Sequence, residues 1–404
     1  MKAYVVSLGC PKNLTDTESL MSKLAGEGYS FTNDPAKADL ILVNTCAFLQ
    51  SAKKESLETI KELSKYKKKG NCSYLIAAGC LPQRYKHELP ELLPEVDAFI
   101  GTPQKFNKIS KLLKATLPWF AYVKIAEGCN NRCAYCVVPR IRGKLRTRKM
   151  ADVLKEVKLL AKSGVKEVIY VAQDTTAYPK FPELLRKTAR IRGVRWIRVM
   201  YAHPAHVSDK LIETMAREPK IVKYLDLPIQ HCHDKILRRM RRRYERRDLE
   251  NLIRKLRRRK IALRTSVIVG FPGEGEAEFQ ELLDFLKRVK FDRLGVFTYS
   301  REPGTPAFKM RGQVSATKKQ ERSHKLMRLQ ARISQGLNKK MIGKTINTLI
   351  ERIVRNGYIG RTYADAPEID GSVLVKSQKF LKPGEIIKVR ITDAKTYDLI
   401  GSPT

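Results

Sequence analysis

The N-terminal part of the chain alternates short apolar runs with amphipathic segments. Four apolar runs have the length of buried strands: Ala3–Leu8, Leu40–Asn44, Tyr74–Ala78 and Val96–Ile100. Helical periodicity marks three further segments: near Thr17–Ala25, Ala52–Lys65 and Phe106–Leu113. Strands that alternate with helices are typical of a mostly parallel α/β sheet. We therefore predict an α/β domain over residues 1–117.

A second α/β pattern extends from residue 120 to residue 311. Helical patterns separate most of its six candidate strands: Ala121–Ala126, Glu167–Ala172, Trp196–Tyr201, Tyr224–Ile229, Arg264–Val269 and Leu294–Tyr299. Successive strand–helix units of this number predict an open, partial β/α barrel. We assign this second domain to residues 118–335.

The pattern changes again in the C-terminal part. Thr317–Lys340 has the periodicity of a long polar helix. From Thr345 onward, short strands are separated by turn signals that contain Gly or Pro: Asn356-Gly357, Asp370-Gly371 and Lys382-Pro383-Gly384. Short strands between such turns predict a small all-β barrel, over residues 336–404.

The composition excludes several classes of protein. A chain of 404 residues suits two or three domains, and a hydrophobic fraction of 43% is enough to build their cores. No apolar run approaches the ~20 residues needed to span a bilayer, and the N-terminus lacks the layout of a signal peptide. We therefore expect a cytoplasmic protein, not bound to a membrane, whose eight cysteines are reduced thiols.

The charge balance is strongly basic. Lys and Arg number 80 against 41 Asp and Glu, which gives a net charge of +39. A field of this sign attracts polyanions, so RNA or the ribosome is an expected partner. The densest basic stretch, Lys235–Lys260, is equally compatible with two solvated helix faces. Charge alone therefore names no partner.

Three cysteines close together in the sequence carry the most specific signal. Cys129, Cys133 and Cys136, the loop triad, have the spacing C-x3-C-x2-C. Three thiolates can hold three irons of a cubane cluster and leave the fourth iron open. The alternatives are a zinc site and structural thiols. Structural zinc favours four ligands, and the next histidine along the chain is His203, so the spacing favours an iron–sulfur cluster.

Three other cysteines each follow a predicted strand. Cys10, Cys46 and Cys80, the strand-end triad, lie at or just past the carboxyl ends of the first three strands. In a parallel sheet these ends share one ligand-binding edge, so the three thiols are expected to converge. A single cysteine is more often buried in a core, but three at equivalent strand ends favour a second cluster. Cys72 and Cys232 fit neither triad.

This organisation resembles the radical S-adenosylmethionine methylthiotransferases. Members of that family have an N-terminal methylthiotransferase domain, a radical S-adenosylmethionine core and a C-terminal TRAM domain. The resemblance covers nearly the whole chain. Besides the loop triad, its most specific strings are Ser7–Asn13, Val43–Cys46, Gly79–Leu81 and Tyr299–Ala307.

The resemblance implies two 4Fe–4S clusters and S-adenosylmethionine as cofactors. The cluster on the loop triad would pass an electron, supplied by an external donor, to S-adenosylmethionine, and the resulting 5′-deoxyadenosyl radical would take a hydrogen from the substrate. The cluster on the strand-end triad would carry the sulfur that is methylated and inserted into the C–H bond. The protein's part in such chemistry is position and electronics.

Further contacts with S-adenosylmethionine are implied at fewer residues. Tyr135 matches the aromatic position that lies by the adenine in the family. Gly270, Pro272 and Gly273 resemble the family's glycine-rich turn near the cofactor, although an ordinary strand-to-helix turn explains them equally well. The polar side chains at strand ends are weaker candidates by the barrel-mouth rule: Gln173, Asp174 and Asp226.

Two branches of the family differ in substrate. One modifies an adenosine in tRNA, and the RimO type modifies the β-carbon of an aspartate in small-subunit ribosomal protein number twelve. Ser7–Asn13 and Gly360–Gly371 resemble the second branch. Within the latter string, Asp365, Glu368 and Asp370 predict an acidic patch that suits a basic protein loop and repels phosphate, unless they form an acidic turn with no partner.

We therefore predict methylthiolation of this ribosomal aspartate, with the tRNA adenosine as the alternative substrate. A non-catalytic iron–sulfur protein that binds RNA or senses redox state is the hypothesis from another class. It explains the charge and one cluster. It does not require two open-iron triads or a barrel.

Overall fold

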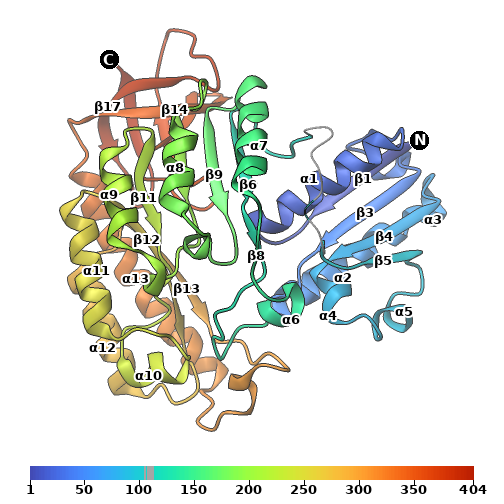
Figure 1. Ribbon diagram of the computed structural model, residues 1–404, viewed down its shortest axis with the longest axis horizontal. Helices are drawn as coiled ribbons and strands as arrows, with labels where there is room; N and C mark the ends of the chain where they lie inside the picture. Colours follow the sequence, from blue (N-terminus) through green and yellow to red (C-terminus); the bar gives the residue numbers. More distant parts are fainter. Residues whose placement is uncertain (104–105, 107–112) are drawn as a thin grey trace.

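The computed structural model describes residues 1–103, 106 and 113–404 (Figure 1). The helix predicted near Phe106–Leu113 lies outside this part of the chain, apart from its two end residues. In the part described, no helix combines the length and the apolar character needed to cross a bilayer.

Five parallel strands form the N-terminal sheet, in the order β2-β1-β3-β4-β5. Their bounds are β1 Lys2–Ser7, β2 Ser30–Phe31, β3 Leu40–Thr45, β4 Tyr74–Gly79 and β5 Ala98–Ile100. Every residue of β3 is buried, as is typical of a central strand covered on both faces. The parallel α/β sheet is thus confirmed. Only β2 was not predicted, because two residues are too few to show a periodicity.

Helices cover this sheet and begin at its carboxyl edge. α1 (Pro11–Gly26) follows β1, and α2 (Gln50–Ser64) follows β3, both close to the predicted segments. Pro11 starts α1 at the first helical position, where its missing N–H leaves no hydrogen bond unmade. Shorter helical segments complete the domain: η1 Pro35–Lys37, α3 Tyr66–Lys69, α4 Cys80–Arg84 and α5 Leu89–Leu92.

Six parallel strands form the central sheet, in the order β13-β12-β11-β10-β9-β6, so neighbours in the chain are neighbours in space. Their bounds are β6 Phe120–Lys124, β9 Glu167–Val171, β10 Trp196–Val199, β11 Ile221–Asp226, β12 Ala262–Val269 and β13 Arg293–Thr298. The sheet curves with helices on its outer side and does not close (Figure 1). The predicted partial β/α barrel is confirmed.

The helices of this barrel are α7 Met150–Lys162, α8 Phe181–Ala189, α9 Asp209–Arg217, α10 Asp234–Arg239, α11 Arg246–Arg258 and α12 Glu276–Val289. Short elements lie at the loops: α6 Val138–Arg142, η2 Thr175–Ala177, η3 Pro204–His206 and η4 Pro306–Lys309. β7 (Ala126–Glu127) and β8 (Arg146–Thr147) pair antiparallel on either side of the loop triad. The pairing of β7 with β8 brings together the two ends of the segment that carries the loop triad.

A long helix leads to the C-terminal barrel. α13 (Ala316–Lys339) matches the predicted polar helix closely. The closed barrel β14-β15-β16-β18-β17 that follows confirms the predicted all-β tail. Its strands are β14 Thr345–Val354, β15 Gly357–Thr362, β16 Val373–Val375, β17 Ile386–Ala394 and β18 Leu399–Pro403.

The acidic string of the tail does not form the predicted docking patch. Asp365 is buried and accepts from Arg293 Nη2 at 2.5 Å. The Asp370 carboxylate accepts from Tyr224 Oη at 2.7 Å and from Arg264 Nε at 3.3 Å. Buried carboxylates require such partners, and strands of the central barrel supply them. Two of the three acidic residues therefore dock the tail on the barrel, and the prediction was wrong for them.

The barrel and the tail also share a buried core. Glu167 of β9 accepts from Arg198 Nε at 2.7 Å and from Arg361 Nη2 of β15 at 2.6 Å, all three side chains being buried. Around them an apolar cluster joins residues of both parts, among them Phe120, Tyr122, Ile169, Trp196 and Leu349. The tail is thus packed against the barrel rather than tethered to it. The predicted boundaries at residues 117/118 and 335/336 remain predictions.

Candidate functional site

The strand-end triad gathers at one edge of the N-terminal sheet. β1, β3 and β4 are adjacent parallel strands, and Cys46 and Cys80 directly follow the last two. Burial raises the pKa of Cys46 to about 11, and the nearby thiolates of Cys80 and Cys10 add to this rise. The predicted convergence of three thiols from distant segments is therefore present.

Hydrogen-bond donors surround these thiols. Cys10 precedes α1, and although burial raises its pKa, the charge of Lys12 and the backbone N–H of Asn13 outweigh burial and lower it. Arg142 Nη2 donates to Cys80 Sγ at 3.2 Å. Donors aimed at sulfur stabilise thiolates, which are the form that binds metal.

Gly9 allows the thiols to approach. A Cβ at Gly9 would lie 2.7 Å from Cys46 Cβ and 2.9 Å from Cys46 Sγ, and its φ of +88° suits glycine. The residue before Cys10 is therefore confined to glycine by both space and backbone conformation.

The loop triad lies between β7 and α6. Each of its sulfurs accepts one N–H group: Cys129 from the backbone of Asn131 at 3.4 Å, Cys136 from that of Val138 at 3.4 Å, and Cys133 from Arg242 Nη1 at 3.5 Å. Burial, together with the thiolates of Cys133 and Cys129, raises the pKa of Cys136 to about 12. These three thiols are therefore also gathered at one place.

Neither triad is as compact as the site of a single ion. Zinc–sulfur bonds of about 2.3 Å bring the ligand atoms of one ion to within about 4 Å of each other. Within the described chain, the three-ligand set whose atoms all lie within 4.8 Å is Asp174, His203 and His206, and neither triad is so compact. Three open-spaced thiols with N–H donors fit the sulfur ligands of a cubane cluster.

The compact set around Asp174 is already occupied by hydrogen bonds. Asp174 Oδ2 accepts from Asn131 Nδ2 at 2.6 Å and pairs with His206 Nδ1 at 2.7 Å. His203 Nδ1 accepts from the backbone of Ala205 at 3.3 Å, and burial lowers the pKa of His203 to about 3, so its ring is neutral. Because Asn131 also donates to Cys129, the set anchors the loop triad.

Tyr135 lies beside the predicted glycine-rich turn. Its ring meets Phe271 edge-on, with the centroids 6.4 Å apart, and Phe271 sits between Gly270 and Pro272 in the turn. The Tyr135 hydroxyl accepts from Arg242 Nη1 at 3.4 Å. The structure thus brings these predicted residues together, and their contact with a cofactor stays a prediction.

The polar groups of that turn are largely paired within the protein. Gly270 N–H donates to Glu274 Oε2 at 2.9 Å, and Gly273 N–H donates to the Gly312 carbonyl at 2.8 Å. The Pro272 carbonyl accepts from Arg239 Nε at 2.8 Å. The backbone of the turn is therefore held in place by the chain itself.

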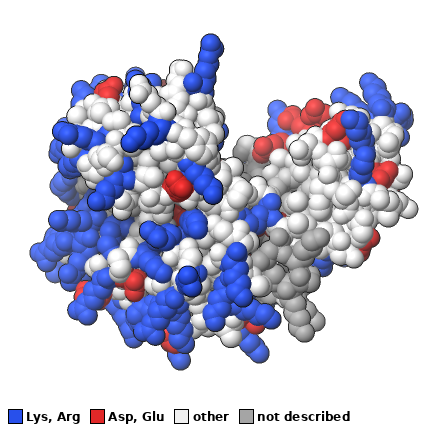
Figure 2. Space-filling model, turned by 90° about the horizontal axis from the view of Figure 1, so that it is seen from above, with Lys and Arg blue, Asp and Glu red and all other residues white. Residues whose placement is uncertain are grey.

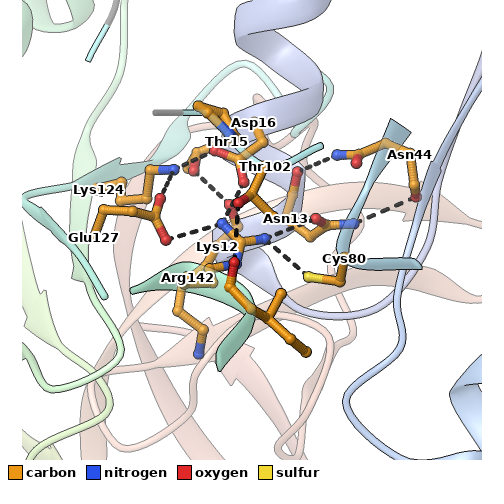
Figure 3. Close-up of polar contacts among 12 residues, drawn as sticks. Lys12, Asn13, Thr15, Asp16, Asn44, Cys80, Thr102, Lys124, Glu127 and Arg142 are labelled. Carbon is orange, nitrogen blue, oxygen red and sulfur yellow. Dashed lines mark hydrogen bonds and ion pairs between the residues drawn. The ribbon is translucent and has the colours of Figure 1, made fainter. Parts of the chain in front are cut away.

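A buried charge network joins the N-terminal domain to the barrel (Figure 3). Arg142 Nη1 donates to Asp16 Oδ2 at 2.6 Å and to Glu127 Oε1 at 3.0 Å, and its Nη2 donates to Asn13 Oδ1 at 3.1 Å. Lys124 pairs with Glu127 at 2.6 Å and also with Asp16. Two positive and two negative side chains thus compensate each other inside the interface.

A second contact uses the string Tyr299–Ala307. Glu302 is buried and accepts from Arg84 Nη2 at 2.9 Å and from the backbone of Gln50 at 2.9 Å. Arg84 also donates to the carbonyl of Ala47, next to Cys46. This string therefore holds the barrel against the edge that carries the strand-end triad.

The strand-end triad faces the mouth of the barrel. Tyr201 follows β10, at the carboxyl end where barrels place their sites, and the Lys12 ammonium lies 3.2 Å from the centroid of its ring. Burial and then the Cys10 thiolate hold the pKa of Tyr201 well above its ordinary value, which places that thiol close by. Asp226, a predicted strand-end candidate, accepts from Tyr201 N–H at 3.0 Å.

The remaining candidates have structural roles. Gln173 Nε2 donates to Glu127 Oε1 at 2.9 Å and so joins the charge network. Cys72 is buried outside both triads, and Cys232 lies in a loop just past β11, as expected. The arginines at the sulfurs and the charge network were missed, because long-range pairs leave no local sequence signal.

Comparison with known proteins agrees with this architecture. Residues 123–286 match the profile of the radical SAM superfamily, residues 2–101 that of the uncharacterized protein family UPF0004, and residues 342–403 that of the TRAM domain. A ribosomal protein uS12 methylthiotransferase RimO of Thermoanaerobacter sp. is 44% identical over 98% of both chains. One of Desulforamulus reducens is 45% identical, again over 98% of both chains.

The chain belongs to the RimO family of methylthiotransferases. Its enzyme class is that of the radical S-adenosylmethionine methylthiotransferases. Among solved structures, the radical S-adenosylmethionine methyltransferase TsrM from Kitasatospora setae aligns over 76% of both chains with a TM-score of 0.57. At 15% identity, this likeness concerns the fold alone.

Proposed function

We propose that the protein transfers a methylthio group to the β-carbon of an aspartate in ribosomal protein uS12. RimO relatives that carry this substrate in their names match 98% of the chain, which supports the choice over a tRNA adenosine. The observation that carries the proposal is the meeting of two cysteine triads at one interface, with the strand-end triad facing the mouth of a partial barrel.

We infer that each triad holds one 4Fe–4S cluster through three cysteines. The three thiols and the N–H donors at each set support this assignment. When bound, the two clusters supply the electron for S-adenosylmethionine cleavage and an iron for the sulfur to be inserted. Tyr135, Gly270, Pro272 and Gly273 remain our candidates for contact with S-adenosylmethionine.

The chain's own residues bring the two sites together. The charge network around Arg142 and the Arg84–Glu302 pair fix the N-terminal sheet edge over the barrel mouth. The paired side chains of both contacts are at most one-tenth exposed, so the contacts hold the interface from within.

We further propose that the protein contacts RNA through the groove between α7 and α8. The groove has a volume of about 890 Å³, and six basic residues line it: Lys155, Lys158, Lys162, Lys187, Arg190 and Arg192. Lys187 pairs with Glu183 at 2.8 Å, and within the described chain the other five form no ion pair. None of the described residues that line the groove is acidic, which suits a phosphate backbone.

The surface charge supports the same partner. Lys and Arg side chains crowd much of the face in Figure 2, with few acidic ones among them on the larger lobe. An enzyme that acts on a ribosomal protein works next to RNA, and we infer a cytoplasmic location for the same reason. An external electron donor completes the set of partners that we propose.

The substrate is tested in cells with and without the gene. Mass spectrometry of uS12 should find a methylthio group on one aspartate only when the gene is present. The tRNA nucleosides from the same cells should be unchanged. Loss of a methylthio group from a tRNA adenosine, with uS12 unchanged, would contradict the proposal.

A further inference from the structure

A cation without an ion-pair partner in the described chain lies beside the mouth of the barrel. Within the described chain, no carboxylate or hydrogen-bond acceptor pairs with the Lys12 ammonium, and its one close contact is the face of Tyr201 at 3.2 Å. Lys12 lies two residues after Cys10, while Tyr201 lies at the barrel mouth. The ammonium therefore lies between the triad assigned to the sulfur and the barrel assigned to the radical.

The Cys10 thiolate lies close enough for the charge of Lys12 to lower its pKa, but no carboxylate of the described chain pairs with this ammonium. The two carboxylates of the charge network, Asp16 and Glu127, are already paired with Arg142 and Lys124. Asp226 pairs with Arg264 instead. A cation held by an aromatic face alone retains its capacity to bind a carboxylate.

We propose that Lys12 is the counter-ion of the substrate aspartate and selects it by its carboxylate. This inference rests on the proposed function, since it names the group that recognises the proposed substrate. A site built around an ion pair rejects an isostere that lacks the charge, because the buried cation is then left unpaired. Asparagine has the shape of aspartate without its charge, so it is the discriminating analogue.

The test compares two uS12 peptides, one with the target aspartate and one with asparagine there, using cluster-loaded enzyme. We expect wild-type enzyme to prefer aspartate, and Lys12→Gln to lose that preference by roughly tenfold or more, mainly through KM. Lys12→Arg should restore most of it. Lys53→Gln is the matched control, because Lys53, on α2, also lies over a tyrosine ring, that of Tyr85 at 3.7 Å, and not over Tyr201.

Each outcome has a separate meaning. An unchanged preference for aspartate in Lys12→Gln would overturn this inference and leave the proposed function intact. Failure of wild-type enzyme to modify the aspartate peptide, or uS12 itself, would overturn the proposed function. Iron content, measured alongside, must match wild type for the comparison. If Lys12→Gln loses iron, Lys12→Met takes its place, and a retained preference there overturns the inference as well.

A second, independent observation concerns two buried arginines. Arg142 donates to Cys80 Sγ at 3.2 Å, and Arg242 donates to Cys133 Sγ at 3.5 Å, so each triad has one guanidinium at one sulfur. Asp16 and Glu127 pair with Arg142. Within the described chain no carboxylate pairs with Arg242, which donates to Tyr244 Oη and the Pro228 carbonyl.

A positive charge and a hydrogen bond at a ligand sulfur both stabilise the reduced form of a cluster. We infer that Arg142 and Arg242 are positioning residues, each of which raises the reduction potential of the cluster on the triad it contacts. The inference rests on the proposed clusters. Because its charge is uncompensated, Arg242 should act more strongly than Arg142.

The test is potentiometric titration followed by electron paramagnetic resonance. Alanine at all three cysteines of one triad isolates the cluster on the other. We expect Arg142→Gln to lower the potential of the strand-end cluster alone, and Arg242→Gln to lower that of the loop cluster by more. Arg84→Gln is the control, since Arg84 is a buried interface arginine that contacts no sulfur.

Unchanged potentials in variants that hold their clusters would overturn the inference. If a glutamine variant cannot hold its cluster, the lysine variant is titrated instead, because it keeps the charge while losing the fork of donors. If the reduction potential of the lysine variant falls below that of Arg84→Gln, the hydrogen bond contributes to the potential. If the two potentials are equal, the role of the hydrogen bond is overturned. Absence of clusters from wild-type protein would instead overturn the proposed function.

Discussion

At the residue scale, the interface depends on ionised groups that are buried together. Asp16 and Glu127 face Lys124 and Arg142, and all four side chains are at most one-tenth exposed. Burial of single charges is costly, but a network in which every charge is paired is tolerated. The consequence is asymmetric: removal of one member leaves its partner buried and unpaired.

Glu127→Gln is therefore expected to destabilise the protein strongly. Removal of this carboxylate leaves two cations facing one anion, and loss of one partner of a buried pair costs about 3–5 kcal/mol. The midpoint of urea unfolding measures the change. Glu183→Gln serves as the control, because the Glu183–Lys187 pair is exposed and its loss should change the midpoint little. Equal midpoints for the two variants would contradict this account of the network.

The Glu127 carboxylate should also make the free energy of unfolding fall as the pH becomes acidic. Burial raises the pKa of Glu127, but Lys124 and then Arg142 outweigh it and hold the pKa at about 2. A pKa below the ordinary 4.5 means that the contribution is complete above pH 4.5 and is lost as the pH falls toward 2. In the protein before cluster loading, Glu127→Gln should remove part of this decline. If the stability of Glu127→Gln falls with pH as steeply as that of wild type, other groups cause the decline.

At the scale of elements, the turn from β1 into α1 builds the strand-end triad. Gly9 has a positive φ of 88°, Cys10 precedes the helix, and Pro11 is the first residue of the helix. Such turns were predictable in type, because Gly and Pro flank the cysteine in the sequence. The contact of Gly9 with Cys46 was not, since it joins segments that lie far apart along the chain.

Gly9→Ala is expected to abolish the strand-end cluster and spare the loop cluster. The added Cβ would press on Cys46 at 2.7 Å, against a neighbour that must stay in place to bind iron. Iron content should fall by about half, since one of two four-iron clusters is lost. Gly28→Ala is the matched control: its φ of +87° carries the same backbone strain, but nothing lies within 4 Å of the new Cβ. Full iron content in Gly9→Ala would refute the argument.

The elements also show what a sequence reveals and what it conceals. Periodicity and apolar runs predicted β1, β3, β4, the six barrel strands and α13, because these signals are local. The loop triad was predicted from its spacing, and the strand-end triad from the edge that parallel strands share. Strands of two residues, such as β2 and β7, carry no period to detect. The acidic string of the tail misled the prediction, because exposure was assumed for Asp365 and Asp370, and their partners Arg293 and Arg264 lie on barrel strands.

At the scale of the whole molecule, three parts are locked into one arrangement. The tail is docked through Glu167 and Arg361, and the N-terminal sheet through Arg142 and Glu302. With both interfaces buried, the strand-end edge and the barrel mouth stay opposed. Lys and Arg side chains crowd much of the face in Figure 2, which is the charge that the proposed RNA contact requires.

Substitution of Lys155, Lys158 and Arg190 by alanine should weaken RNA binding. If each contacts one phosphate of a duplex, the slope of log affinity against log salt should fall by about 0.9 per residue removed. Fluorescence anisotropy with a ribosomal RNA hairpin, repeated across salt concentrations, measures the slope. Alanine at Lys65, Lys68 and Lys69, which are exposed on the N-terminal domain, removes the same charge elsewhere. Equal losses from the two triple variants would indicate non-specific attraction and no groove.

The most direct test of the central claim is mass spectrometry of uS12 after anaerobic incubation with reduced enzyme and S-adenosylmethionine. Three proteins are compared: wild type, a variant with alanine at Cys10, Cys46 and Cys80, and one with alanine at Cys129, Cys133 and Cys136. We predict a methylthio group on one aspartate with wild type and none with either variant. A methylthiolated aspartate produced by either variant would contradict the claim that both triads carry out the reaction together.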